Sequence, residues 1–95
     1  MDEHPGIGFV DGPAGRRAVL VGTGLDVWEV IGVLKENRGS AAAVARYLEV
    51  PESRVRDAVR YYAAFPSEID AWLRLQEEAA AREEAASRHE RAILA

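Results

Sequence analysis

Arginine side chains recur on one side of a helix that the sequence predicts near residues 51–64. At 100° per residue, one sector of this helix is apolar and is expected to be buried: Val55, Ala58, Val59 and Tyr62. The opposite side carries Ser53, Arg56, Asp57 and Arg60, with Arg54 at its border. Arginine can bind guanine through two hydrogen bonds, and both arginine and serine can hold phosphates. We therefore expect this helix to contact DNA, and we expect Arg38 and Arg46 to reach the phosphate backbone.

A second interpretation stays open for this arginine-bearing face. Exposed arginines are often only solvated, and tri-helical units of this kind also serve in dimerisation or peptide binding. The alternative hypothesis is therefore a protein-interaction adaptor that uses the same fold without binding DNA.

No arrangement typical of an enzyme or a metal site is found in the sequence. The two histidines, His4 and His89, lie near opposite ends and lack the spacing of metal ligands. The G-x-G pairs at 6–8 and 22–24 lack the strand–glycine–helix context of a nucleotide site. No nucleophile lies beside a base. We therefore expect a non-enzymatic protein that needs no metal or cofactor.

Two short helices joined by a tight turn must position the arginine-bearing face. The first spans residues 40–48, with Ser40 as its cap, and the second runs from Pro51 to about residue 64, before Phe65-Pro66. Ala45 supplies the small residue of a helix-turn-helix, and Val50 and Val55 supply the apolar ones. Glu49 stands where glycine often provides a left-handed turn, at a cost of about 1 kcal/mol.

The segment before these helices is predicted to form a β-hairpin and one further helix. Residues 7–10 and 17–21 are β-rich runs on either side of a turn at residues 11–15. A helix at residues 26–37 follows, with Asp26 as its cap and Glu29 completing a capping box. Its apolar stripe comprises Val27, Val30, Ile31 and Leu34, with Trp28 on the flank.

The C-terminal segment is predicted to be one long helix capped by Ser67. It starts apolar and becomes rich in Glu, Ala and Arg, so it is a marginal helix unless a partner stabilises it. Trp72, Ala79, Ala86 and Ile93 recur every seven residues as a narrow seam. The candidate partner-binding residues are Trp72, Leu73, Leu75, Ala79, Ile93 and Leu94. For Ile69, Trp72 and Leu73, a place in the domain's own core is an equally good interpretation.

Composition and charge are typical of a small cytoplasmic protein. The 95 residues have a net charge of −4, distributed as −3 over residues 1–15, +2 over 16–66 and −3 over 67–95. A basic middle between acidic ends is compatible with DNA binding by the middle alone. There is no cysteine, no signal peptide is expected at the N-terminus, and no apolar run is long enough to span a membrane.

Three stretches resemble a known family, over roughly residues 7 to 75. Residues 22–30, Gly-Thr-Gly-Leu-Asp-Val-Trp-Glu-Val, residues 55–63, Val-Arg-Asp-Ala-Val-Arg-Tyr-Tyr-Ala, and residues 65–70, Phe-Pro-Ser-Glu-Ile-Asp, resemble motifs of the domain of unknown function 433 family. Gly24 departs from this pattern, since the family usually has arginine there. Any role of that arginine is either lost in this protein or filled by Arg16 or Arg17. The resemblance implies a homeodomain-like helix-turn-helix and a VapB-type antitoxin whose partner is a small PIN-like ribonuclease toxin.

The sequence and the resemblance together predict a mainly α fold: an N-terminal β-hairpin, a homeodomain-like tri-helical helix-turn-helix and a long C-terminal helix. Residues 1–66 would form the DNA-binding and dimerisation domain, and residues 67–95 the partner-binding helix. The leading hypothesis is an antitoxin-like autoregulator that binds its own operator as a homodimer and neutralises a cognate toxin. Besides the adaptor, a stand-alone regulator whose C-terminal helix only forms a dimeric coiled coil remains an alternative.

Overall fold

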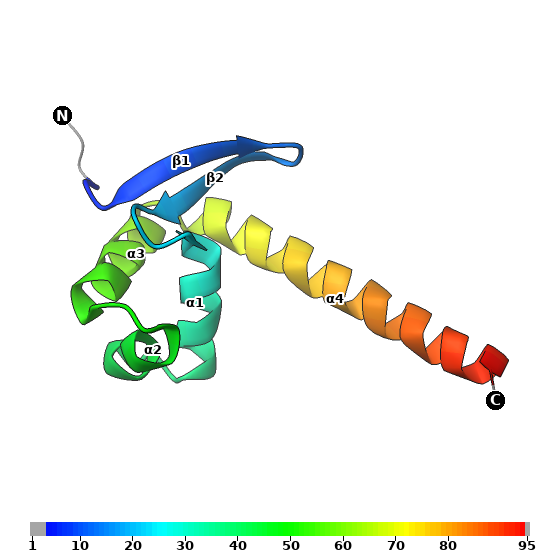
Figure 1. The fold of residues 1–95 in the computed structure, drawn as a ribbon. Coiled ribbons are helices and arrows are strands. Elements are labelled where there is room, and N and C mark those ends of the chain that lie inside the picture. Colours follow the sequence, from blue (N-terminus) through cyan, green and yellow to red (C-terminus); the bar gives the residue numbers. More distant parts are fainter. Residues whose placement is uncertain (1–3, 95) are drawn as a thin grey trace.

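The computed structural model describes residues 4–94, which form an N-terminal three-stranded antiparallel sheet and four helices (Figure 1). The strands are β1 (Ile7–Gly12), β2 (Gly15–Leu20) and β3 (Leu25–Asp26). The helices are α1 (Val27–Glu36), α2 (Ala41–Leu48), α3 (Glu52–Ala64) and α4 (Pro66–Leu94). The mainly helical fold, the N-terminal hairpin and the long last helix are therefore as predicted.

The sheet consists of the predicted hairpin and a short third strand that was not predicted. Strand β1 pairs with β2 so that Ile7 faces Leu20 and Gly12 faces Gly15. Strand β3 contains two residues and pairs with β2 through Leu25 and Asp26. An isolated hairpin is marginal in water, and this one is held because Ile7, Ala18 and Leu20 are buried against the helices.

Helix α1 begins at the predicted cap. Asp26 and Glu29 form the capping box, in which the Asp26 backbone N–H donates to Glu29 Oε1 at 3.0 Å. The Asp26 carboxylate also accepts hydrogen bonds from Arg17 Nε at 2.7 Å and Trp28 Nε1 at 2.9 Å. One side chain thus joins β2 to the start of α1.

The core lies where the sheet, α1, α2 and α3 meet. Each of these elements contributes fully buried apolar side chains, and α4 contributes Ile69 from its first turn, 1% exposed. The buried set comprises Ile7, Ala18, Leu20, Val27, Val30, Ile31, Val44, Val55, Ala58, Tyr61 and Ile69. For Ile69, the structure thus supports the core interpretation over partner contact.

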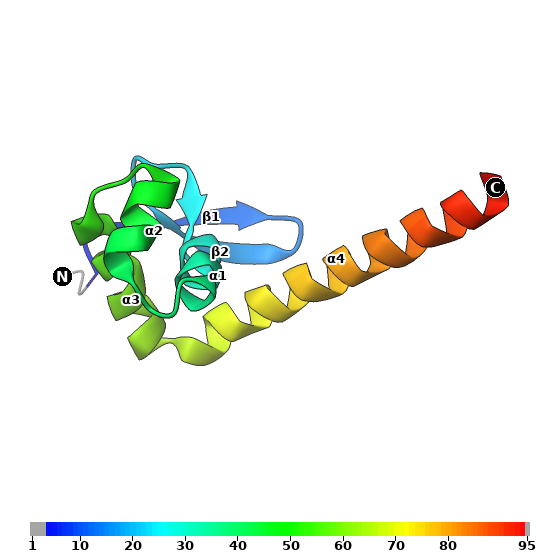
Figure 2. The ribbon, with the colours of Figure 1, turned by 90° about the horizontal axis from the view of Figure 1, so that it is seen from below.

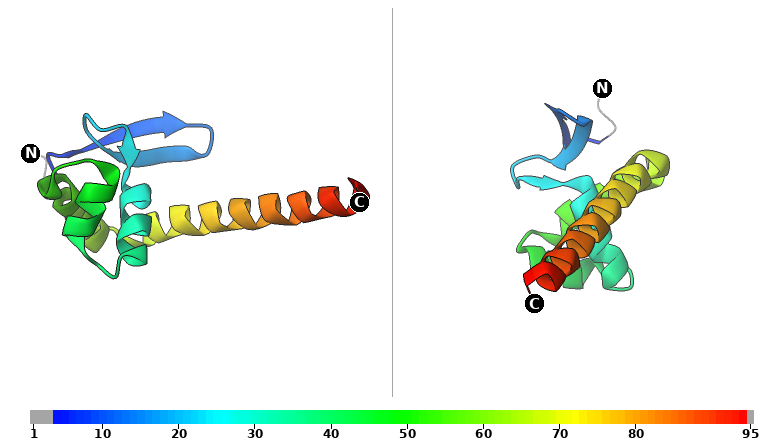
Figure 3. Two further views of the ribbon diagram at one scale, coloured as in Figure 1. Left: turned by 60° about the horizontal axis from the view of Figure 1, so that its bottom comes forward. Right: turned by 90° about the vertical axis from the view of Figure 1, so that its right-hand side faces the viewer.

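Helix α4 starts at Pro66 and not after a Ser67 cap, so the predicted cap is wrong. Proline suits the first helical turn, because its φ is already helical and its missing N–H has no partner to lose there. After Ala79 every described residue of α4 is exposed, and the helix leaves the body as an arm (Figures 2 and 3). The hairpin projects on the same side of the molecule (Figure 3).

Candidate nucleic-acid interface

A tight left-handed turn fixes α3 relative to α2. Ser40 caps α2 by accepting a hydrogen bond from the Ala43 backbone N–H at 3.2 Å. Glu49 ends α2 with φ 58° and ψ 45°, so it adopts the left-handed conformation predicted for this position. The Val50 N–H donates to the Ala45 carbonyl at 3.0 Å, and Pro51 then precedes α3. The chain therefore reverses within a few residues between the two helices.

The buried side of α3 differs in part from the predicted sector. Val55 and Ala58 are fully buried, as predicted, but Val59 is 36% exposed and Tyr62 is only half-buried. Tyr61, which was not predicted, is buried instead. The reason is that the N-terminal strand packs along α3 and extends the buried sector toward Tyr61, away from Val59.

Three of the candidate DNA-contacting residues share the exposed side of α3: Ser53, Arg56 and Arg60. The side chains of Arg56 and Arg60 are 66% and 63% exposed. Arg56 Nη2 lies 3.0 Å from Glu52 Oε1, and Arg60 Nη1 lies 3.6 Å from Asp57 Oδ1. Exposed pairs within one helix are weak, so both guanidinium groups can exchange these partners for phosphate or a base edge.

Arg54 and Asp57 lie on the side of α3 that faces the sheet. Arg54 Nη2 donates to the Val21 carbonyl, and its Nη1 lies 3.4 Å from Asp57 Oδ2. A Cβ added at Gly6 would clash with Asp57 Oδ2, so the N-terminal segment passes very close to this pair. The structure thus uses Arg54 and Asp57 to hold the sheet against α3, and it leaves Arg56 and Arg60 as the outward arginines.

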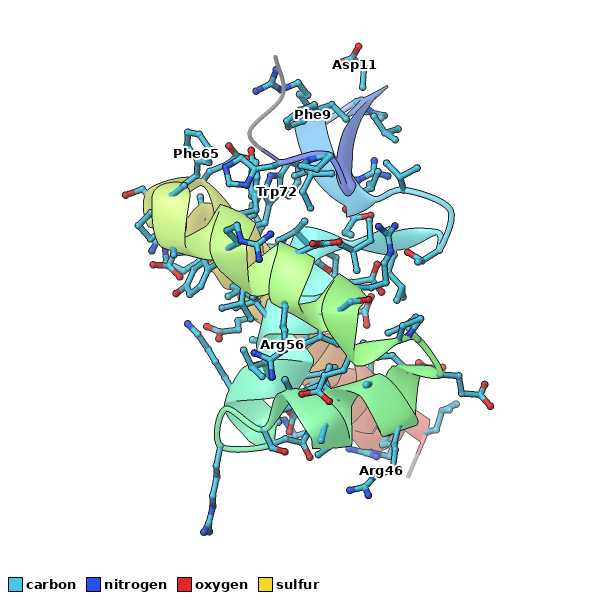
Figure 4. The ribbon with its side chains drawn as sticks, turned by 90° about the vertical axis from the view of Figure 1, so that its left-hand side faces the viewer. Phe9, Asp11, Arg46, Arg56, Phe65 and Trp72 are labelled. Atoms are coloured by element: carbon cyan, nitrogen blue, oxygen red, sulfur yellow. The ribbon has the colours of Figure 1, made fainter. Side chains whose placement is uncertain are left out.

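Arg38 and Arg46 are both exposed, and both lie outside α3. Arg38 sits in the α1–α2 connection with φ 56°. Arg46 projects from the side of α2 remote from α3 (Figure 4). A shallow hollow lies nearer to Arg56 and is lined by Leu34, Gly39, Ala41, Arg56, Val59, Arg60 and Ala63. The α3 face therefore continues toward the start of α2 and not toward Arg46.

Tyr61 belongs to a second polar feature, which no sequence pattern indicated. Its hydroxyl donates to the Glu68 carboxylate, with oxygen distances of 2.9 and 3.0 Å. Burial and the hydrogen bond to Glu68 raise the pKa of Tyr61 to about 12. The Tyr61 ring also contacts Phe9 and Phe65 at centroid distances of 6.1 and 4.8 Å. Tyr61 on α3 thus contacts β1 through Phe9 and α4 through Glu68.

The candidate partner-binding residues divide between two sides of α4. By helical geometry the predicted seam of Trp72, Ala79, Ala86 and Ile93 forms one side of α4. Leu75 lies on the same side, and from here on we call this whole side the seam. In Figure 4, Trp72 lies on the side of the helix toward the sheet, and it is half-buried. Leu73 points the opposite way and packs against the core. On the seam, Leu75 and Ile93 are 45% and 70% exposed, so the seam reaches the end of the arm without cover from its own domain. Leu94, 77% exposed, lies off the seam.

Within residues 4–94, the structure contains no group of three or more His, Asp or Glu side chains placed to hold a metal ion. No helix in this range is both long enough and apolar enough to cross a membrane. Comparison with protein-family models, curated proteins and solved structures gave no match for the chain.

Proposed function

We propose that this protein is a DNA-binding regulator in which α1, α2 and α3 form a homeodomain-like helix-turn-helix and α3 reads the DNA. The observation that carries the proposal is the outward face of α3, where Ser53, Arg56 and Arg60 are exposed on a helix whose other side is locked in the core. Arginine on such a helix can reach guanine edges in the major groove, and serine can hold phosphate.

The geometry of the turn between α2 and α3 supports this proposal. A helix that reads DNA must be held at a fixed angle, and Glu49 accepts a strained left-handed conformation to make that angle. Charge supports it as well, because residues 16–66 carry a net +2 within a chain of net −4. The acidic ends would be repelled by phosphate, which favours contact through the middle of the chain.

The protein would bind its operator as a homodimer. A single tri-helical unit contacts few base pairs, and two linked units gain affinity because the second binding event is intramolecular. A palindromic site in the DNA upstream of its own gene is the expected target, and this would make the protein an autoregulator.

The test of DNA binding compares arginines on and off the α3 face. We expect Arg56→Ala plus Arg60→Ala to weaken binding to the upstream duplex at least about tenfold and to reduce the slope of log affinity against log salt by about 1–2. Arg82→Ala removes the same charge from the exposed surface of α4 and should leave both quantities unchanged. Electrophoretic mobility shifts at several salt concentrations measure both quantities.

Two results would contradict DNA binding by this face. One is an unchanged affinity and salt slope in the double variant. The other is the absence of any shift with wild-type protein, on the upstream duplex and on random duplex alike. The second result, combined with binding of a protein partner, would favour the adaptor.

We further propose that the seam binds a protein partner. The resemblance to antitoxins implies that this partner is a PIN-like ribonuclease, and the exposure of Leu75 and Ile93 along an otherwise charged arm supports a protein ligand. A PIN-like nuclease encoded beside this gene is the expected partner, and Leu75→Asp plus Ile93→Asp should abolish its binding and inhibition. Ala85→Asp plus Ala92→Asp adds the same charge off the seam and should spare both. If the seam variant still inhibits the nuclease, the seam is not its binding surface.

A further inference from the structure

A groove lies between α1 and α4, on the side of α4 opposite the seam. It encloses about 720 Å³. Its floor is apolar and comprises Trp28, Gly32, Val33, Leu73 and Ala80. Gly32 adds no side chain to this floor, and a Cβ placed there would make an ordinary contact with Leu73 Cδ2 at 3.4 Å. A helix laid along α4 would therefore find an apolar floor here.

The walls of this groove are mainly acidic. They include Glu29 and Glu36 from α1 and Asp70 and Glu77 from α4, against only two cations, Lys35 and Arg74, a net of −2. Lys35 is already engaged, because its Nζ lies 3.6 Å from Asp70 Oδ1 and 5.3 Å from the centre of the Tyr62 ring. The groove therefore suits a helix that is apolar along one line and basic beside it.

The far end of α4 presents that combination on the same side as the groove. Arg91 follows Leu73 by 18 residues, which is five full turns at 3.6 residues per turn. Leu73 and Arg91 therefore point in the same direction from the helix axis. Arg88, Arg91 and Leu94 are exposed near this line, whereas His89 and Glu90 point away from it. The end of the arm is thus both basic and apolar. It cannot reach the groove of its own chain, because a straight helix holds the two about 30 Å apart.

We propose that the groove binds the arm of a second copy of this chain, with the two α4 helices antiparallel. Leu94 of each copy then lies against Leu73 of the other, and each Arg91 lies beside the other's Glu77. A two-fold axis makes both contacts occur twice. In the antiparallel order the positive end of each helix dipole lies beside the negative end of the other, which is favourable. Glu84 lies near the axis, where its own Arg88, 3.9 Å away, offsets the repulsion between copies.

This assignment leaves the seam free, because the seam lies on the other side of α4. It also does not depend on DNA binding: a protein that binds no DNA can still form this dimer. The dimer test below contains no DNA, so its failure and the failure of the DNA proposal are separate results.

The test is a charge exchange across the groove, followed by sedimentation velocity of the full chain over a concentration series at low ionic strength. Wild type should reach twice the chain mass of 10.4 kDa. Glu77→Arg and Arg91→Glu should each raise the dimer dissociation constant at least about tenfold, and the double variant should restore it. Glu78→Arg and Arg82→Glu make the same changes on the opposite side of α4 and should leave the dimer intact.

Cysteine cross-linking tests the antiparallel order, since the chain has no cysteine of its own. Glu84→Cys, near the two-fold axis, should form a disulfide-linked dimer on mild oxidation, whereas Leu94→Cys should not, because the two Leu94 residues lie at opposite ends. Three results would overturn the proposal: a monomer at every concentration, a dimer that ignores the Glu77→Arg change, or a stronger cross-link at Leu94→Cys than at Glu84→Cys. The groove would then be left for another protein.

Discussion

Asp26 shows how one side chain can join two kinds of secondary structure. It is 7% exposed, and its Oδ2 accepts from both Arg17 and Trp28. An ionised carboxylate buried to this degree is tolerated because its oxygens are hydrogen-bonded and one partner is charged. The capping role followed from the Asp26–Glu29 spacing, but the two further donors come from β2 and from the Trp28 indole. A local spacing rule does not contain either of them.

Tyr61 is the residue at which the fold responds to alkaline pH. Its pKa is raised from 10.0 to about 12, first by burial and then by the hydrogen bond to Glu68. Because the folded state holds the proton more tightly than the unfolded state, the stability from this group is complete below pH 10 and is lost as pH rises toward 12. The Tyr61–Glu68 hydrogen bond therefore contributes fully up to about pH 10, the ordinary pKa of tyrosine.

We expect Tyr61→Phe to reduce the free energy of unfolding at pH 7 by about 1 kcal/mol, because Glu68 loses its donor. The difference between wild type and the variant should shrink between pH 10 and 12, where wild type loses the Tyr61 proton. Urea unfolding at a series of pH values measures this difference. Tyr47→Phe, at a tyrosine that is 73% exposed, is the control. A difference that stays constant to pH 12 would contradict the account.

The neighbouring positions show why part of the site was predicted and part was not. The helical period alone located Arg56 and Arg60 on the outer side of α3 and Val55 on the inner side, as found. It misplaced Val59 and did not detect Tyr61, because the buried sector of a helix depends on what packs against it. Here the N-terminal strand covers the side of Arg54, Asp57 and Tyr61. A helical wheel uses the sequence of one helix alone, so it does not include contacts with that strand.

At the scale of elements, the turn between α2 and α3 is set by a residue that is poorly suited to its conformation. Glu49 is one of two non-glycine residues with positive φ among the described residues; the other is Arg38. A side chain with a Cβ costs about 1–2 kcal/mol in this region. The turn forms because the packing of Val50 and Val55 and the hydrogen bond to the Ala45 carbonyl hold it.

Glu49→Gly should therefore raise the free energy of unfolding, by up to about 1 kcal/mol, since glycine relieves the strain but gains freedom in the unfolded chain. Glu36→Gly, at an exposed helical position of α1, should lower it by about 1 kcal/mol. Chemical denaturation of both variants gives the comparison. Equal losses in the two would mean that the left-handed turn stores no strain.

The helices were predictable as elements because each carries its own start and stop signals. In the structure α1 begins directly after Asp26 and α2 directly after Ser40. Helix α3 ends just before the Phe65-Pro66 pair. Strand β3 was not predictable, because two residues show no alternation and the strand exists only by pairing with β2. Elements defined by local signals were thus read from the sequence, and the element defined by a distant partner was not.

At the scale of the whole molecule, the chain is elongated. Its Cα radius of gyration is 15.7 Å, whereas a compact domain of this length is expected near 12 Å. The arm is responsible for the excess, and Figure 1 shows it leaving the body on the side away from α3. DNA on α3 and a protein on the outer arm would therefore not collide. In the antiparallel dimer the two α3 helices would lie at the far ends of the paired arms.

The two opposite sides of α4 make it a point of thermodynamic linkage. A charged arm of this kind is only marginally helical on its own, so whichever ligand orders it first removes an entropic penalty that the second would otherwise have to overcome. A second copy in the groove and a protein on the seam would then favour each other although they never touch. Under the two proposals, the cellular concentration of the protein would then control both its affinity for DNA and its affinity for a protein on the seam.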